Sequence, residues 1–407
     1  MFSEEIKNNS VLQWSLGSLI FCYFIVFMGW QSMGSTATTA LDELTYVCPP
    51  YFQACEIFYF LEALPFGYSQ NIFYMGLFLI LTWSTYLIAK RAWRAVQISL
   101  LPIWLWHSLN VLFFTDMRAG NYEYYLIVFG FILLCLPHKE FFLKLSLVIF
   151  YVLSTMAKLH PSWIEGSYFS ALKTGLPIFP DWSIPLFTNL VIMAEMLGSW
   201  FLLSNKPKVQ KIAFWFFVVF HLYSGILVGY RYPATVLPFL IILFGPWYRY
   251  TPVPRSKKSL WGWGLILILF ALQISPKLIP GDEKLTLEGN KYGLYMFEAN
   301  HQCFSDITIN YNAPKLPTKQ TTTNANARNR CDPYQTWFRL QNICKHDSSV
   351  VSIGWRQNHS INGGPFYKIV DTDNACLLTY KAYSHNPWIQ TADTAPITGY
   401  PVKNFYR

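Results

Sequence analysis

Long apolar blocks dominate the chain, and they constrain its fold more than any other feature. Only 13% of the 407 residues are charged, against about 25% in an ordinary soluble domain. Nine blocks are long enough, or nearly so, for a helix to cross a hydrocarbon core, which takes about 20 helical residues. The blocks are Val11–Trp30, Asn71–Ala89, Ala95–Phe114, Tyr122–Leu136, Leu143–Ala157, Ser183–Leu203, Ile212–Gly229, Ala234–Trp247 and Leu260–Pro276. The pattern predicts a polytopic α-helical membrane protein with about nine transmembrane helices.

Basic residues follow every second apolar block, and their placement predicts a topology. They are Lys90, Arg91 and Arg94; His138, Lys139 and Lys144; Lys206, Lys208 and Lys211; and Arg249, Arg255, Lys257 and Lys258. Short loops rich in lysine and arginine remain on the cytoplasmic side. We therefore expect a multi-pass protein of a bacterial inner membrane or its equivalent, with a cytoplasmic N-terminus and residues 277–407 outside.

The first apolar block resembles a secretory signal peptide, because small residues follow it. Glu4 and Glu5 outnumber Lys7 in front of it, and the apolar run is longer than a typical signal sequence. We therefore predict a retained helix. The net charge of +9 is spread over short loops, so no nucleic-acid partner is expected.

Six of the eight cysteines lie in segments predicted to be outside. They are Cys48, Cys55, Cys303, Cys331, Cys344 and Cys376. Disulfides persist in oxidising compartments, so this placement agrees with the topology. The four late cysteines lack CxxC spacing, which favours disulfides over a zinc site, and three pairings among them remain open.

The composition changes after Pro276, where polar residues take over. Alternating apolar residues in Ser349–Trp355 and Phe366–Val370 predict short strands, and Leu285–Phe297 also alternates. Residues Thr321–Asn329 have the composition of an exposed loop. The sequence therefore predicts two domains: residues 1–276 in the membrane, and residues 277–407 as a small, β-rich, disulfide-containing extracytoplasmic domain.

Four ionisable side chains lie within the apolar blocks: His107, Glu123, Glu195 and His221. Such groups are costly in a bilayer and tend to face a cavity or a partner. A histidine that packs in neutral form, or a helix-to-helix hydrogen bond from Glu195, would account for them without function. They are also the first candidates for a site.

Lys158 follows the fifth block on the predicted outer side, where the topology rule does not favour a lysine. Its side chain could extend to the membrane surface. Alternatively, a partly desolvated amine can act as a neutral general base.

Lys158 opens a pattern, Lys-Leu-x-x-x-Trp-x-x-Gly, formed by Lys158, Leu159, Trp163 and Gly166. This pattern resembles the vitamin K-dependent gamma-carboxylases and the bacterial relatives that share the horizontally transferred transmembrane (HTTM) domain. Three further stretches carry the resemblance: Asp116–Leu126, Phe220-His221 and Gly289–Met296. Their order and spacing agree over most of residues 1–300.

The resemblance implies an enzyme of the carboxylase-like lyase class that uses reduced vitamin K or menaquinol, molecular oxygen and carbon dioxide. In that family a base deprotonates the hydroquinone, and a strong base formed with oxygen then removes the γ-proton of a glutamate. Lys158 matches the family's base, and His221 joins it as a catalytic candidate. Glu195, Glu123, Tyr122, Trp163 and His160 are the candidates for the quinone pocket. The partners implied are membrane lipid and a secreted or periplasmic protein or peptide.

The chain departs from the family where carboxylases have a functional histidine in an Asn-Asn-His-Ser-Tyr-Leu-like stretch. Here the sequence is Asn121-Tyr122-Glu123-Tyr124-Tyr125-Leu126, so Glu123 or Tyr122 takes that place. The loss favours an alternative, a non-enzymatic receptor, immunity or assembly factor that binds a partner through its C-terminal domain. A transporter is not favoured, because no inverted repeat is evident. No Gly-rich phosphate loop or paired-histidine zinc helix is present, so neither a phosphate cofactor nor a metal is expected.

Overall fold

The computed structural model describes residues 4–32, 46–57, 70–114, 121–170, 175–295, 299–312, 314–324 and 331–401. The chain forms two compact units, and each unit gathers segments that are far apart in sequence. The helical unit comprises Met1–Leu41, Cys55–Thr155 and Met193–Phe270. The sheet unit comprises Asp42–Ala54, Met156–Ile192 and Ala271–Arg407, so segments from the predicted membrane domain belong to it.

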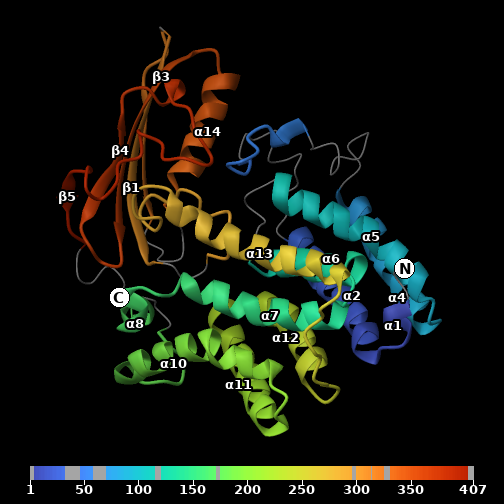
Figure 1. Ribbon diagram of the computed structural model, residues 1–407. Helices are drawn as coiled ribbons and strands as arrows, with labels where there is room; N and C mark the ends of the chain where they lie inside the picture. Colours follow the sequence, from blue (N-terminus) through green and yellow to red (C-terminus); the bar gives the residue numbers. More distant parts are fainter. Residues whose placement is uncertain are drawn as a thin grey trace. The chain divides into compact units, whose positions relative to one another are not determined.

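The helical unit is a bundle whose central helices are α2 and α7. Helix α2 contacts α4, α6 and α12, while α11 packs against α12 and α5 against α4 and α6 (Figure 1). Helix α7 is buried along nearly all of its length. The helices are α1 (Glu4–Lys7), α2 (Ser10–Ser32), α4 (Gln70–Ala89), α5 (Trp93–Leu109), α6 (Asn121–Cys135), α7 (Lys139–Met156), α11 (Pro207–Val228), α12 (Arg231–Phe244) and α13 (Leu260–Ile274). Helix α10 (Ile184–Met196) begins in the sheet unit, and its last four residues belong to the helical unit. Shorter π- or 3₁₀-helical turns are η3 (Asn110–Phe114), η5 (Gly198–Leu203) and η6 (Lys257–Ser259).

Each of the nine predicted apolar blocks contains a helix in the described part of the chain. Five helical stretches there are long and apolar enough to cross a membrane: Ser10–Gln31, Ile72–Ala89, Trp93–Phe113, Pro207–Leu227 and Lys257–Leu278. Asn121–Cys135 and Arg231–Phe244 are apolar but shorter. Helix α7 carries Lys139, Glu140 and Lys144 in its first two turns. The predicted helical class is confirmed, and five of its helices could cross a membrane by length and composition. The count of nine spans stays a prediction.

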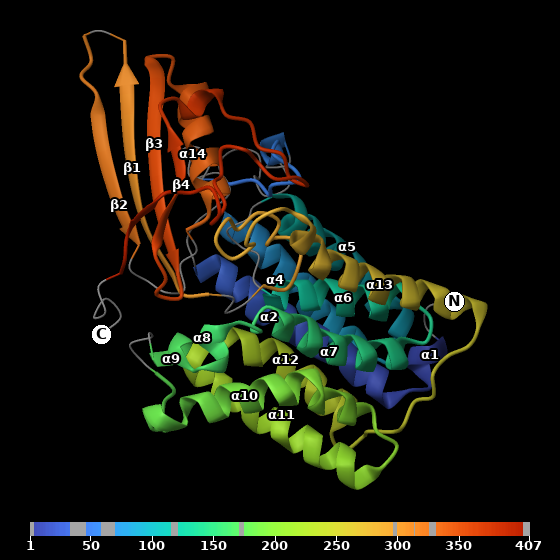
Figure 2. The ribbon, with the colours of Figure 1, turned by 60° about the vertical axis from the view of Figure 1, so that its left-hand side comes forward.

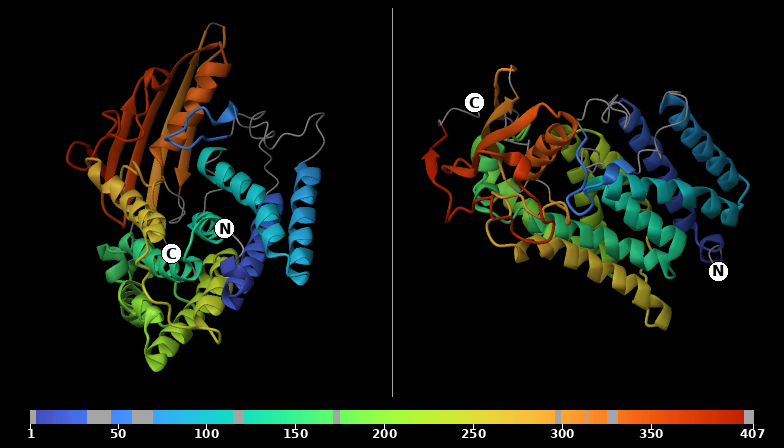
Figure 3. Two further views of the ribbon diagram at one scale, coloured as in Figure 1. Left: turned by 45° about the vertical axis from the view of Figure 1, so that its right-hand side comes forward. Right: turned by 90° about the horizontal axis from the view of Figure 1, so that it is seen from above.

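The sheet unit is built on a five-stranded antiparallel sheet with the order β2-β1-β3-β4-β5. Helix α14 (Pro333–His346) lies along the sheet beside β3 (Figures 2 and 3). The strands are β1 (His301–Tyr311), β2 (Thr318–Asn324), β3 (Val350–Ile361), β4 (Phe366–Thr372) and β5 (Ile397–Gly399). Short helical segments are α8 (Pro161–Ile164), α9 (Ser167–Ser170), η4 (Asp181–Ser183), η7 (Ser275–Leu278) and η8 (Ala375–Leu377).

Helix α14, which the sequence analysis did not predict, has a capped N-terminus. The carboxylate of Asp332 caps it by accepting the backbone N–H of Tyr334 at 2.9 Å, and Pro333 takes the first helical position. Its apolar face buries Tyr334, Trp337 and Phe338. This covered face explains why one side of the sheet can be apolar.

The prediction of a β-rich C-terminal region is confirmed, and so are the two strands predicted within β3 and β4. The prediction of a loop over Thr321–Asn329 is wrong for its first four residues. Residues Thr321–Asn324 continue β2 and pair with β1, because β-branched threonines favour extended pairing even when exposed. Residues 325–329 lie outside the described part. Over 285–295 the alternating segment forms turns and no strand.

The predicted disulfide framework is confirmed. Of the three pairings open to the late cysteines, the structure has Cys303–Cys331 and Cys344–Cys376. Cys48 and Cys55 are also disulfide-bonded, while Cys22 and Cys135 are free.

Candidate functional site

A hydrogen bond between Tyr151 and His221 lies inside the helical unit. The Tyr151 hydroxyl and His221 Nε2 are 2.6 Å apart, and both side chains are almost fully buried. The Tyr151 ring stacks on Phe217 at 4.3 Å, so helix α7 presents its hydroxyl to α11 in an aromatic setting. In this setting His221 can exchange a proton with a phenolic hydroxyl.

Glu195 bonds the same face of α7. The Thr155 hydroxyl lies 2.6 Å from Glu195 Oε2 and 2.7 Å from the backbone carbonyl of Tyr151. A hydroxyl has one proton and the carbonyl can only accept, so Thr155 either donates to an ionised Glu195 or accepts from a protonated one. Thr155 therefore bonds this buried carboxyl group in both of its protonation states.

Two further tyrosines complete this group. The Tyr125 ring stacks on Phe150 at 4.2 Å, and the Tyr232 ring lies 5.5 Å from His221 and 6.2 Å from Tyr125. All of them are buried. We call this set the tyrosine–histidine cluster: Tyr125, Tyr151, Thr155, Glu195, His221 and Tyr232. It places acid–base groups from α6, α7, α10, α11 and α12 among aromatic rings.

A second buried group joins α2, α5 and α6. His107 Nε2 lies 2.8 Å from Glu123 Oε2, and the indole N–H of Trp30 donates to Glu123 Oε1 at 3.1 Å. We call these three residues the histidine–glutamate cluster. Neither His107 nor Glu123 is exposed at all. In the sequence, Glu123 or Tyr122 stands where carboxylases have a functional histidine. In the structure a histidine, His107 of α5, lies beside Glu123.

Arg231 lies near this cluster, at the start of α12. Its Nη2 donates to the carbonyl of Gly29 at 3.2 Å, and its side chain hydrogen-bonds Tyr122. A Cβ atom at Gly29 would meet the guanidinium at 3.0 Å, so the missing side chain lets Arg231 approach. Tyr122 therefore belongs to the surroundings of the arginine.

The Lys158 segment belongs to the sheet unit. Lys158 is only 3% exposed, and its Nζ lies 5.5 Å from the centre of the Trp163 ring. His160 precedes α8, and Trp163 lies within it, with its indole N–H donating to the carbonyl of Thr188 at 3.2 Å. At Gly166 φ is +77°, and a Cβ would lie 2.8 Å from Ile184, so the position requires glycine.

The structure thus brings the predicted residues together in three groups. Glu195 and His221 share the tyrosine–histidine cluster, Glu123 has His107, and Lys158 lies with His160 and Trp163. Tyr151 and Thr155 were not predicted as site residues from the sequence. Their spacing of four puts them on one helix face, but their neutral side chains gave no ionisable signal.

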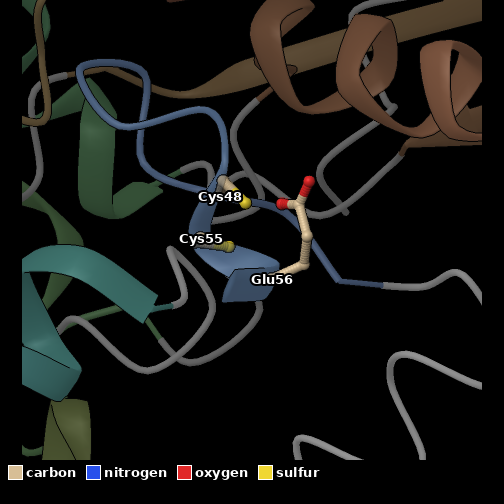
Figure 4. Close-up of side chains that lie close together, drawn as sticks. All are labelled: Cys48, Cys55 and Glu56. Carbon is tan, nitrogen blue, oxygen red and sulfur yellow. The ribbon is translucent and has the colours of Figure 1, made fainter. Parts of the chain in front are cut away.

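Cys48, Cys55 and Glu56 are close enough to suggest a metal site, since their ligand atoms lie within 4.8 Å of one another (Figure 4). Both cysteines, however, are disulfide-bonded. Metal ligation by cysteine requires a thiolate, so this trio does not form a metal centre in the oxidised protein.

Comparison with known proteins assigns no identity: no family model, curated protein or solved structure matches the chain. The candidate site therefore stands on its geometry.

Proposed function

We propose that this protein is a membrane enzyme that resembles the vitamin K-dependent gamma-carboxylases and modifies a secreted or periplasmic protein with a reduced quinone and oxygen. The observation that carries the proposal is the tyrosine–histidine cluster. Buried acid–base groups in apolar helices are costly, and they are expected where a reaction needs proton transfer away from water. Glutamate carboxylation is the reaction that the resemblance favours.

The proposal includes a topology of nine spans with a cytoplasmic N-terminus and residues 277–407 outside. Five membrane-length apolar helices support it, as do the basic loops after every second block. The disulfides of the sheet unit support an oxidising compartment for that unit.

Lys158 is the proposed base. Its amine is buried and lies against the face of Trp163. It also takes the place of the family's base in the pattern formed by Lys158, Leu159, Trp163 and Gly166. The glycine of the family-like pattern is also explained by the local structure. Gly166 has a positive φ and lies so close to Ile184 that a side chain would not fit.

The tyrosine–histidine cluster has the chemistry to hold a quinol headgroup. Its rings offer flat apolar walls, and the carboxyl group of Glu195 and the imidazole of His221 are acceptors for ring hydroxyls. When bound, the reduced quinone would supply the reducing equivalents for oxygen. In this chain Tyr151 and Thr155 would orient His221 and Glu195, and the surrounding aromatic side chains would exclude water.

The test incubates the purified protein in nanodiscs with menaquinol or reduced vitamin K, oxygen, labelled bicarbonate and glutamate-containing peptides. We expect label in the peptide, and at least a 100-fold loss in Lys158→Ala, as is typical when a positioned base is removed. Lys381→Ala, an exposed lysine of the same unit, is the matched control. If Lys158→Ala retains wild-type activity, the lysine mechanism is wrong.

The alternative, a receptor, immunity or assembly factor, is favoured by a hollow on the sheet. The hollow measures about 570 Å³, and polar side chains dominate its lining, among them Asp306, Thr308, Asn310 and Arg356. Such a surface suits a polar partner. Absence of quinol binding and turnover, together with binding of a partner lost in Arg356→Ala, would favour this function over the enzyme.

A further inference from the structure

The two ring nitrogens of His107 have different surroundings. Nε2 faces the Glu123 carboxylate at 2.8 Å, and Trp30 holds the other carboxylate oxygen. An ionised Glu123 only accepts hydrogen bonds, and beside it Nε2 carries the proton of the neutral imidazole. Nδ1 then bears the lone pair, as in other sites where a carboxylate fixes the histidine tautomer.

Nδ1 has no hydrogen-bond partner among the described residues, although His107 is completely buried. Two neighbouring hydroxyl groups share this condition: Tyr23, whose ring lies 5.3 Å from that of His107, and Ser108, the next residue in the chain. Native proteins pair most of their buried polar atoms. The unpaired Nδ1 of His107 and the unpaired hydroxyl of Tyr23, on neighbouring rings, therefore point to a ligand that supplies the missing bonds.

Aromatic rings surround His107 on the side of α2. The Trp30 ring stacks on the imidazole at 5.5 Å and 21°, Phe27 lies at 6.3 Å, and Tyr23 meets it edge-on. These walls suit a flat aromatic molecule. Among the described residues, Glu123 on α6 is a charged neighbour of His107, and Arg231 on α12 lies beyond Gly29.

The backbone is also irregular here. Helix α5 ends at Leu109, two residues after His107, and the chain continues directly as the π-helical turn η3. Pi-helical turns are rare and frequently occur at functional sites.

We propose that His107 is a general base that accepts a proton from the hydroxyl group of a planar aromatic ligand, and that Glu123 is its positioning residue. The ligand's O–H bond breaks, the proton forms a bond with Nδ1, and the electron pair remains on the ligand as an aryloxide. Glu123 stabilises the imidazolium, and Trp30 keeps the carboxylate in place. This site is separate from the tyrosine–histidine cluster, to which the proposed function assigns the quinol, so the inference goes beyond that function and concerns a second phenolic ligand.

The experiment needs no turnover and uses the full-length protein in detergent with 4-nitrophenol, whose phenolate has its own absorption band. Difference spectra are recorded at a pH below the ordinary pKa of the phenol, against micelles without protein. We expect bound phenolate with wild-type protein and none with His107→Gln. Glu123→Gln should reduce it about tenfold or more, as is typical for losing a carboxylate that orients a histidine. The methyl ether 4-nitroanisole should compete for the site.

Controls separate proton transfer from folding and from the quinol reaction. His138→Gln alters a histidine that bonds Ser256 near the surface and should leave the signal unchanged. Elution volume and melting temperature identify folded variants, and His107→Asn replaces His107→Gln if the latter unfolds. Equal phenolate in wild type and the His107 variants, or none with wild type at saturating probe, would overturn the proposal. Loss of carboxylation in Lys158→Ala bears only on the proposed function, since this assay contains neither quinol nor oxygen.

Discussion

The helical and sheet units both bury a histidine, but they give it different partners. In the helical unit His107 faces the carboxylate of Glu123 at 2.8 Å. In the sheet unit His359 Nε2 faces His301 Nδ1 at 3.0 Å, and its own Nδ1 donates to the carbonyl of Leu285 at 2.7 Å. Burial and the neighbouring His301 lower the pKa of His359 well below its usual range.

This difference separates a histidine that faces an opposite charge from one whose protonation is opposed by burial and by a neighbouring histidine. A carboxylate stabilises an imidazolium by its charge, whereas a second imidazole brings no opposite charge. The His301–His359 pair therefore fits a structural role in joining β1 to β3, and the histidine–glutamate cluster fits proton transfer. Four predictions test this contrast.

The largest expected effect follows from removing the carboxylate. Glu123→Ala leaves His107 Nε2 and the Trp30 indole buried without their acceptor. Each buried unsatisfied donor costs about 1–3 kcal/mol, so the free energy of unfolding should fall by about 2–6 kcal/mol. Thermal denaturation in detergent measures the change. Glu165→Ala, at an exposed position, is the control. A loss no larger than that of the control would mean that the pair does not hold α5 to α6.

The sheet unit should depend on its disulfides instead. Replacing Cys344 and Cys376 together with serine releases a loop with a sequence separation of 32 residues, which should cost about 3–4 kcal/mol. Limited proteolysis with mass spectrometry should locate the new cleavage sites within the sheet unit. Cys135→Ser, at a free cysteine, is the control. New cleavage mainly within α2 or α7 would contradict the assignment.

A smaller effect should appear as a pH dependence. The folded-state pKa of His359 is lowered, so below about pH 6.5 the unfolded chain binds a proton that the folded chain does not. Stability should therefore fall as the pH drops from 7 to 5, by up to about 1.4 kcal/mol for each pH unit. Melting temperatures of wild type and His359→Gln should converge toward pH 5. The control His346→Gln should keep the wild-type slope of melting temperature against pH. If His359→Gln also keeps that slope, His359 is not the group responsible.

The smallest effect concerns an ion pair at the surface. Lys368 and Arg356 lie 2.6 and 3.1 Å from Asp371 and lower its pKa. The stabilisation is present above about pH 4 and is lost as the pH falls through the lowered pKa. Since these side chains are largely exposed, Asp371→Asn should cost less than about 1 kcal/mol. Melting temperatures of wild type and Asp371→Asn should differ less in ~1 M NaCl, where screening is nearly complete, than without added salt. A loss of stability that does not depend on salt would contradict a simple ion pair.

Much of the fold could be predicted from local patterns. Apolar runs identified the helices, alternation identified β3 and β4, and cysteine placement identified the disulfide framework. These properties depend on neighbours in sequence, so a window of residues contains them. The exposed threonines of β2 were one exception, because composition suggested a loop and only pairing with β1 makes them a strand.

The candidate site could be predicted only in part. Glu195 and His221 were identified because buried charge is costly in apolar helices. Tyr151 and Thr155, their partners, are neutral and common in such helices. The role of His107 could not be predicted, because the carboxylate that it contacts is 16 residues away in the sequence.

The sequence by itself determined the apolar character of the helices, the polar C-terminal region and the cysteines available for disulfides. Tertiary structure alone decided the two disulfide pairings, the strand order and the partner of each buried histidine. The physical reason is that hydropathy is a property of single residues, whereas hydrogen bonds and disulfides depend on distances between groups remote in the chain. A histidine facing a carboxylate and a histidine facing another histidine look alike in sequence, and only the fold makes one a base and the other a structural contact.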